Sequence, residues 1–195
     1  MKRCFWLTLV LTFLTAAPAL MAQASDKVEV GAFVDYFRYT NAPSDVNFVG
    51  LGGRLGVGIA HDIQLEAEMA YDFKRSYTTT FSNGVTTSLG SSGLKVLHGV
   101  FGPKVQVNVG PLQVFATGKV GFDNFNVTGG SAGNGFTNSV GLTNGTTAFA
   151  VYPAGGFALF AGFVGIRAEA GDDIYFLNGG AHNNLRVTFG PQFRF

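Results

Sequence analysis

Alternation of apolar and polar residues with a period of two is the feature that most restricts the fold of this chain. Between Ile63 and Lys74, alternate positions read Ile, Leu, Ala, Met, Tyr and Phe, while the positions between them read Gln, Glu, Glu, Ala, Asp and Lys. Residues 184–195 alternate as cleanly. Because successive side chains of a strand point to opposite faces, this period predicts strands with one apolar and one polar face.

Eight segments carry the pattern to differing degrees, and they are predicted as strands at 28–39, 49–59, 63–74, 94–105, 112–122, 148–159, 163–175 and 184–195. The phase of the fourth is ambiguous. We expect Leu97 and Phe101 on its outer face, because the opposite phase would place His98 and Lys104 in apolar surroundings. The phase of the sixth is poorly determined by its sequence.

The connections between these strands alternate in length. The first, third, fifth and seventh are predicted to be long or polar, at 40–46, 75–93, 126–147 and 176–183. The second, fourth and sixth are predicted to be tight, near 61–62, 108–111 and 161–162. Short turns at one end and longer loops at the other are typical of bacterial outer-membrane barrels. We therefore predict an all-β fold, an eight-stranded antiparallel up-and-down transmembrane barrel, closed so that no strand edge meets lipid.

The first residues have the pattern of an export signal. Lys2 and Arg3 precede an apolar stretch, and Ala22-Gln23-Ala24 matches a cleavage site. We expect residues 1–24 to be a cleaved signal peptide and 25–195 the barrel domain. An uncleaved anchor is the alternative, although the apolar stretch is shorter than the roughly 20 residues that a spanning helix needs. The single cysteine lies in this segment, which excludes disulfides and cysteine metal sites from the mature chain.

Composition excludes two broad classes of protein. Hydrophobic residues make up 47% of the chain, which is too many for a disordered protein. The formal net charge is +1 and no basic run occurs, so we expect no nucleic-acid partner.

The C-terminal segment carries the most specific motif, with Phe189, Pro191, Phe193 and Phe195 at alternate positions. Here the chain resembles the small eight-stranded outer-membrane barrels of the OmpA/OmpX type, in which a similar segment ends in Phe. The resemblance implies the bacterial cell outer membrane as the location and its lipid as the surroundings. It also implies that the barrel-assembly machinery reads Phe189, Phe193 and Phe195 as an assembly signal. Pro191 departs from the family pattern and lacks a ladder donor.

If the apolar face meets lipid, the polar face lines the lumen. The predicted lumen charges are Glu29, Asp35, Glu66, Glu68, Asp72, Asp123, Glu169 and Asp173, with Arg54, Lys74, Lys104, Lys119, Arg167, Arg186 and Arg194. The interior of an eight-stranded barrel is just wide enough for side chains to fill it. Unpaired buried charges are costly, so we expect ion pairs that plug the lumen and have a structural role. A narrow channel or transporter for small solutes is the alternative.

Catalytic and ligand-binding motifs are absent from the sequence. His61, His98 and His182 stand outside any HxH, HExxH or His-x-Ser setting, and no GxSxG occurs. Glu66 and Glu68 have a spacing that a glycosidase could use, but we expect them to form ion pairs. We predict no enzyme activity, no cofactor and no metal, and a structural or surface-interaction role in which the external loops contact any ligand. A lipid-modifying enzyme and a soluble ligand-binding barrel are the remaining alternatives.

Overall fold

The computed structural model describes residues 28–40, 46–82, 87–129 and 145–195, with the backbone alone for 75–82, 87–92 and 127–129. The predicted signal peptide and most of the predicted fifth connection lie outside these residues. Within the described ranges, no helix is long and apolar enough to cross a membrane.

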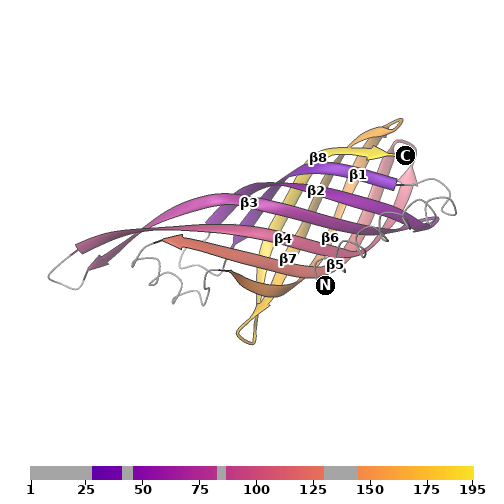
Figure 1. Ribbon diagram of the computed structural model, residues 1–195. Helices are drawn as coiled ribbons and strands as arrows, with labels where there is room; N and C mark the ends of the chain where they lie inside the picture. Colours follow the sequence, from indigo (N-terminus) through magenta and orange to yellow (C-terminus); the bar gives the residue numbers. More distant parts are fainter. Residues whose placement is uncertain (1–27, 41–45, 83–86, 130–144) are drawn as a thin grey trace, which may run out of the picture.

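The chain forms one closed, antiparallel barrel of eight strands in sequence order, which confirms the predicted fold class (Figure 1). The strands are β1 (Val28–Tyr39), β2 (Val46–Ala60), β3 (Ile63–Ser82), β4 (Thr87–Val109), β5 (Leu112–Gly129), β6 (Thr146–Ala161), β7 (Val164–Leu177) and β8 (Gly180–Arg194). All predicted strands are present, and several extend beyond their predicted ends.

The barrel closes where β1 pairs with β8. The amide of Val28 donates to the carbonyl of Phe195 at 3.1 Å, and the amide of Phe195 donates back to the carbonyl of Val28 at 3.0 Å. These bonds lie at the tight-turn end, where Gly110 and Gly162 adopt φ values of +62° and +68°. Closure leaves the described wall without the free edge that lipid would not tolerate.

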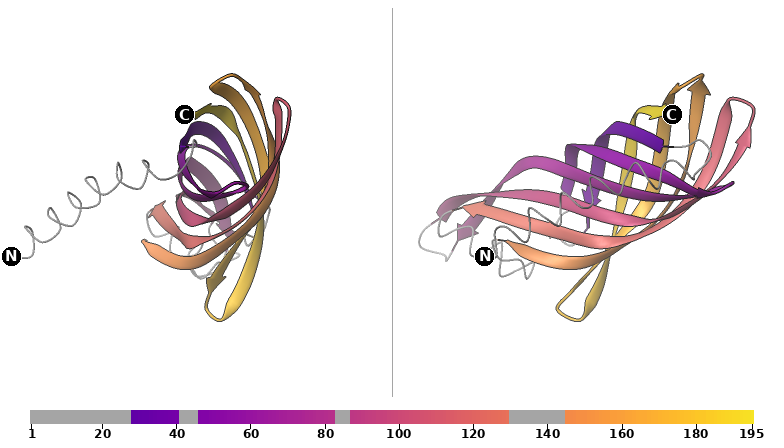
Figure 2. Two further views of the ribbon diagram at one scale, coloured as in Figure 1. Left: turned by 90° about the vertical axis from the view of Figure 1, so that its right-hand side faces the viewer. Right: turned by 45° about the vertical axis from the view of Figure 1, so that its right-hand side comes forward.

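The predicted third connection at 75–93 is wrong for most of its length. The β3–β4 ladder continues from the pair Ser76–Gly93 to the pair Ser82–Thr87. Figures 1 and 2 show this hairpin arm, which contains residues 75–82 and 87–93, reaching past most of the wall, away from the closing end. Polar residues dominate the arm, so the apolar alternation that reveals a lipid-facing strand is missing there. A strand with water on both faces needs no apolar side.

The predicted seventh connection at 176–183 is also wrong, because it is a tight turn. Leu177 pairs with Gly180, and the two residues between them, Asn178 and Gly179, have φ values of 53° and 78°. Two positive φ angles in a two-residue hairpin are the geometry that the Asn-Gly dipeptide favours.

The outer wall is apolar. Leu51, Met69 and Phe157 project outward with 56%, 58% and 53% of their surfaces exposed. In the ambiguous fourth strand, Phe101 points outward, whereas His98 and Lys104 are buried inside. The soluble alternative, with its apolar face inward, is therefore wrong, because an apolar surface this large is stable only against lipid.

Candidate functional site

The lumen contains three zones that follow one another along the barrel axis. Toward the tight turns lies a balanced network of Glu29, Glu66, Glu68 and Glu169 with Arg54, Lys104, Lys119 and Arg167. Next comes the His98 cluster, which consists of Asp35, Asp72, Asp123, Asp173, His98 and Arg186. Toward the external end lies an apolar cap of Phe37, Tyr39, Val46, Phe48, Leu94, Val96, Phe125, Ala148, Ala150 and Tyr175.

Glu66 is the centre of the balanced network. Its two carboxylate oxygens accept hydrogen bonds from Nη1 and Nη2 of Arg167 at 2.5 and 2.9 Å. Lys119 Nζ lies 2.6 Å from Glu66, 2.8 Å from Glu68 and 3.3 Å from Glu169. Arg167 also pairs with Glu169 on its own strand. A bidentate guanidinium and a shared ammonium stabilise buried carboxylates that would otherwise be costly.

Arg54 and Lys104 complete this network. Arg54 Nη1 lies 3.2 Å from Glu169 and 3.4 Å from Glu68, and Arg54 Nη2 donates to Thr188 Oγ1 at 2.8 Å. Lys104 Nζ donates to Glu29 at 2.5 Å. With four acids and four bases, the network is formally neutral.

Two aromatic rings support the guanidinium groups. Arg54 lies 4.3 Å from the ring centroid of Phe33, and Arg167 lies 4.0 Å from that of Phe115. Glycines make room for both rings: a Cβ at Gly52 would lie 2.4 Å from the Phe33 ring, and one at Gly156 would lie 2.7 Å from the Phe115 ring. The ring faces add cation–π attraction to the ion pairs.

The His98 cluster gathers one aspartate from each odd-numbered strand. His98 Nδ1 lies 2.7 Å from Asp123 Oδ1 and 3.2 Å from Asp173 Oδ2, and His98 Nε2 lies 3.0 Å from Asp72 Oδ2. Beside them, Arg186 donates from Nε to Asp35 at 2.8 Å, and its Nη2 lies 2.7 Å from the same oxygen.

The apolar cap closes the lumen above His98. The ring of Phe37 lies 4.7 Å from the His98 ring, centroid to centroid. Further out, the Tyr39 and Tyr175 rings stack at 6.1 Å, and the Tyr175 hydroxyl donates to the Tyr39 hydroxyl at 3.1 Å. His182 stacks on Tyr175 at 4.9 Å. The predicted strand phase places Phe37 on the inner face together with charged residues, but nothing in the sequence indicated that the inward rings gather into an apolar cap.

The predicted lumen charges are buried, with two exceptions. Lys74 is exposed, because the β3–β4 register shifts between Asp72 and Arg75. Arg194 is half-buried at the end of β8, 4.2 Å from the Phe160 ring centroid. The predicted assembly residues Phe189, Phe193 and Phe195 all point outward from the closing end of the barrel.

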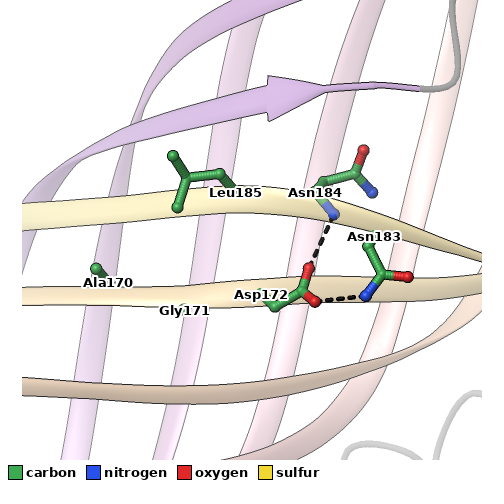
Figure 3. A pocket seen from close by; sticks show the side chains of 6 residues that line it. All are labelled: Ala170, Gly171, Asp172, Asn183, Asn184 and Leu185. Atoms are coloured by element: carbon green, nitrogen blue, oxygen red, sulfur yellow. Dashed lines mark hydrogen bonds between the residues drawn. The ribbon is translucent and has the colours of Figure 1, made fainter.

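A recess of about 430 Å³ lies on the outer wall between β7 and β8 (Figure 3). It is lined by Ala170, Gly171, Asp172, Asn183, Asn184 and Leu185. Asp172 accepts hydrogen bonds from Asn183 Nδ2 at 2.5 Å and from the Asn184 amide at 3.0 Å. The Asp172 carboxylate is therefore already hydrogen-bonded to two residues that line the recess.

No known family model and no curated protein matches the sequence. Among solved structures, the fold is similar to Neisserial surface protein A, with a TM-score of 0.60 at 9% identity over 86% of this chain and 97% of that one. The attachment invasion locus protein Ail of Yersinia pestis gives 0.53 at 13% identity over 87% and 97%. The N-terminal barrel domain of Pseudomonas aeruginosa OprF gives 0.52 at 12% identity over 88% and 100%.

These neighbours are bacterial outer-membrane barrels, and none of their names denotes an enzyme. The predicted type is confirmed at the level of the fold: the chain has the fold of the small eight-stranded outer-membrane barrels, consistent with the predicted resemblance to the OmpA/OmpX type. The apolar outer wall of this chain suits lipid surroundings. The predicted location in the bacterial outer membrane is confirmed.

Proposed function

We propose that this outer-membrane barrel has a structural or surface-interaction role and that its lumen is plugged by its own side chains. The observation that carries the proposal is the succession of balanced network, His98 cluster and apolar cap along the axis. An eight-stranded barrel has interior space for side chains and little else.

A solute that crosses the lumen would have to pass two barriers, the aromatic rings of the apolar cap and the ion pairs of the balanced network. In the cap, Phe37, Tyr39 and Tyr175 are fully buried, so a hydrated solute would have to displace aromatic rings. In the balanced network, it would have to separate Glu66 from Arg167 and Lys119. Breaking such a buried pair costs about 3–5 kcal/mol, which disfavours a narrow channel.

Conductance in planar bilayers tests the plug. The protein, refolded into micelles and inserted, should give no lasting conductance steps, whereas a porin of about 16 strands in the same bilayer provides the open-channel control. Stable steps from this barrel, with sizes that depend on the solute, would favour the transport function instead.

The hairpin arm supports a surface role. Residues 76–93 carry no charged residue and are rich in Ser, Thr and Gly, a composition that favours hydrogen bonding to neutral hydroxylated surfaces such as sugars. Ail, which shares the fold, has been solved with the heparin analogue sucrose octasulfate. We expect this chain to prefer a neutral polysaccharide, because residues 76–93 lack the cations that a sulfated one requires, and Arg75 stands only at the base of the arm.

Shortening the arm tests this role. Replacing 78–91 with Asn-Gly should preserve the barrel, because Tyr77 and Ser92 already face each other in the ladder. Cells that display the shortened protein should lose adherence to an immobilised neutral polysaccharide. Immobilised heparin is the charged comparison. Equal adherence by both forms would show that the arm is not the contact surface.

We further propose that Phe189, Phe193 and Phe195 act as the assembly signal read by the barrel-assembly machinery. Phe189 and Phe193 point outward from β8 and Phe195 is exposed directly after it, which supports this role because a receptor can reach all three rings before the barrel closes against β1.

A further inference from the structure

His98 Nδ1 faces two carboxylates that come from different strands. Asp123 Oδ1 on β5 lies 2.7 Å away and Asp173 Oδ2 on β7 lies 3.2 Å away, and all three side chains are fully buried. On the opposite side of the ring, Nε2 lies 3.0 Å from Asp72 Oδ2. In carboxylate–histidine–metal arrangements, the carboxylate accepts a hydrogen bond from one ring nitrogen and so fixes the proton there. The lone pair of the other ring nitrogen is then free to bind the metal. A proton on Nδ1 serves Asp123, 2.7 Å away, but leaves Asp173 without a donor; with the proton on Nε2 instead, the Nδ1 lone pair faces both carboxylates, and a cation between them satisfies all three groups.

Charge sets this cluster apart from the balanced network. Asp35 is neutralised by Arg186, which leaves Asp72, Asp123 and Asp173 with three negative charges around one imidazole. Arg186 Nη1 reaches Asp173 only at 3.9 Å. Even a protonated His98 leaves a net charge of −2, whereas a divalent cation beside a neutral His98 leaves −1. In the balanced network, by contrast, three of the four glutamates already surround Lys119, and the fourth, Glu29, pairs with Lys104.

Carboxylate oxygens without hydrogen-bond partners also indicate that the His98 cluster needs a further positive group. Among the described residues, neither oxygen of Asp173 accepts a hydrogen bond, and Asp123 Oδ2 and Asp72 Oδ1 accept none. Buried carboxylate oxygens without partners are costly, and the nearest spare donor, Arg186 Nη1, lies too far from Asp173, at 3.9 Å, to form a hydrogen bond.

We propose that His98 Nδ1, Asp123 and Asp173 form a site for one divalent transition-metal ion, with Asp72 as the positioning residue for the histidine. With metal–ligand bonds of about 2.1 Å, neighbouring donors stand about 3.0 Å apart in an octahedron and about 3.4 Å apart in a tetrahedron. The separations of 2.7 and 3.2 Å lie close to these values. One imidazole with two carboxylates suits Zn²⁺, Co²⁺, Fe²⁺ or Mn²⁺.

The ion must enter during folding. The Phe37 ring covers His98 on the external side, and the balanced network fills the lumen on the other. The site therefore forms when β4, β5 and β7 come together, and metal supplied during refolding should remain trapped after free metal is removed.

Refolding from urea into micelles with Co²⁺ tests the site. After gel filtration, the wild-type protein should retain one Co²⁺ per chain, with a visible absorption band of a nitrogen- and oxygen-ligated ion. Asp173→Asn should lose at least tenfold in retained Co²⁺, and Asp72→Asn should weaken Co²⁺ affinity about 10- to 100-fold and shift the band. Glu68→Gln, which removes a carboxylate from the balanced network instead, is the matched control and should retain Co²⁺.

A heat-dependent shift in electrophoretic mobility establishes that each variant is folded before its metal is measured. If Asp173→Asn does not fold, Asp123→Asn replaces it. Wild-type protein that retains no Co²⁺, or a folded Asp173→Asn that retains as much as wild type, overturns the proposal. Neither result depends on whether the barrel conducts solutes or contacts surfaces.

Discussion

Replacement of Glu66 with glutamine should reveal how far the barrel depends on its buried charge balance. The change keeps the side-chain size but leaves Arg167, Lys119 and Lys104, which lie 2.5, 2.6 and 3.8 Å from this carboxylate, with one negative charge fewer. Removing one partner of a buried pair costs about 3–5 kcal/mol. With a urea dependence of about 1–3 kcal/mol per molar, the unfolding midpoint should fall by about 1 M or more.

The midpoint is measured by gel mobility and circular dichroism of the micelle-refolded barrel in a urea series. Asp62→Asn is the matched control, because this carboxylate is half-exposed in a turn and pairs only with exposed His61 among the described residues. Its loss should cost about 0–1 kcal/mol. The double variant Glu66→Gln/Lys119→Met restores neutrality and should be more stable than Glu66→Gln alone. A midpoint for Glu66→Gln equal to that of Asp62→Asn, or no recovery in the double variant, would refute the reasoning.

Three further outcomes are expected. The protein should fractionate with outer membranes and change its electrophoretic mobility only after boiling; recovery in the soluble periplasm without a shift would contradict the membrane placement. Deletion of Phe195 should cost about 1.5–3 kcal/mol at most in micelles yet reduce folded protein in outer membranes much more, and normal membrane levels would remove its assembly role. Gly179→Ala, at a φ of 78°, should destabilise the barrel by about 1–2 kcal/mol, whereas outward Gly118→Ala, with open space around it, should have little effect; equal urea midpoints would argue against strain at the turn.

Alternation predicted the strands best where lipid and lumen impose opposite demands on neighbouring side chains. Residues 63–72 are the clearest case, and the same signal fails a few residues later, where the hairpin arm leaves the apolar surroundings. The Asn178-Gly179 dipeptide is itself a local signal for a tight hairpin turn. The prediction overlooked it because it relied on the polar composition of 176–183.

The partners inside the lumen were beyond reach of the sequence. Alternation indicates which face Arg54 and Glu169 occupy, but their contact joins residues 115 positions apart, through the stagger of strands around the barrel. The His98 cluster depends on the same long-range register. A lone histidine in β4 gives no local sign that aspartates from β3, β5 and β7 lie around it.

The reciprocal hydrogen bonds between Val28 and Phe195 make this barrel a natural subject for circular permutation. A short linker could join these residues, and new ends could open at the tight turn between Asn178 and Gly179. All eight strand pairings would survive, but β1 and β8 would become a covalent hairpin and the seam would move between β7 and β8. The aromatic segment of β8 would then lie inside the chain rather than at its end. Such a permutant would keep the strand pairings on which stability depends but would move the aromatic segment away from the chain end. Its stability in micelles and its insertion in cells could therefore be compared separately.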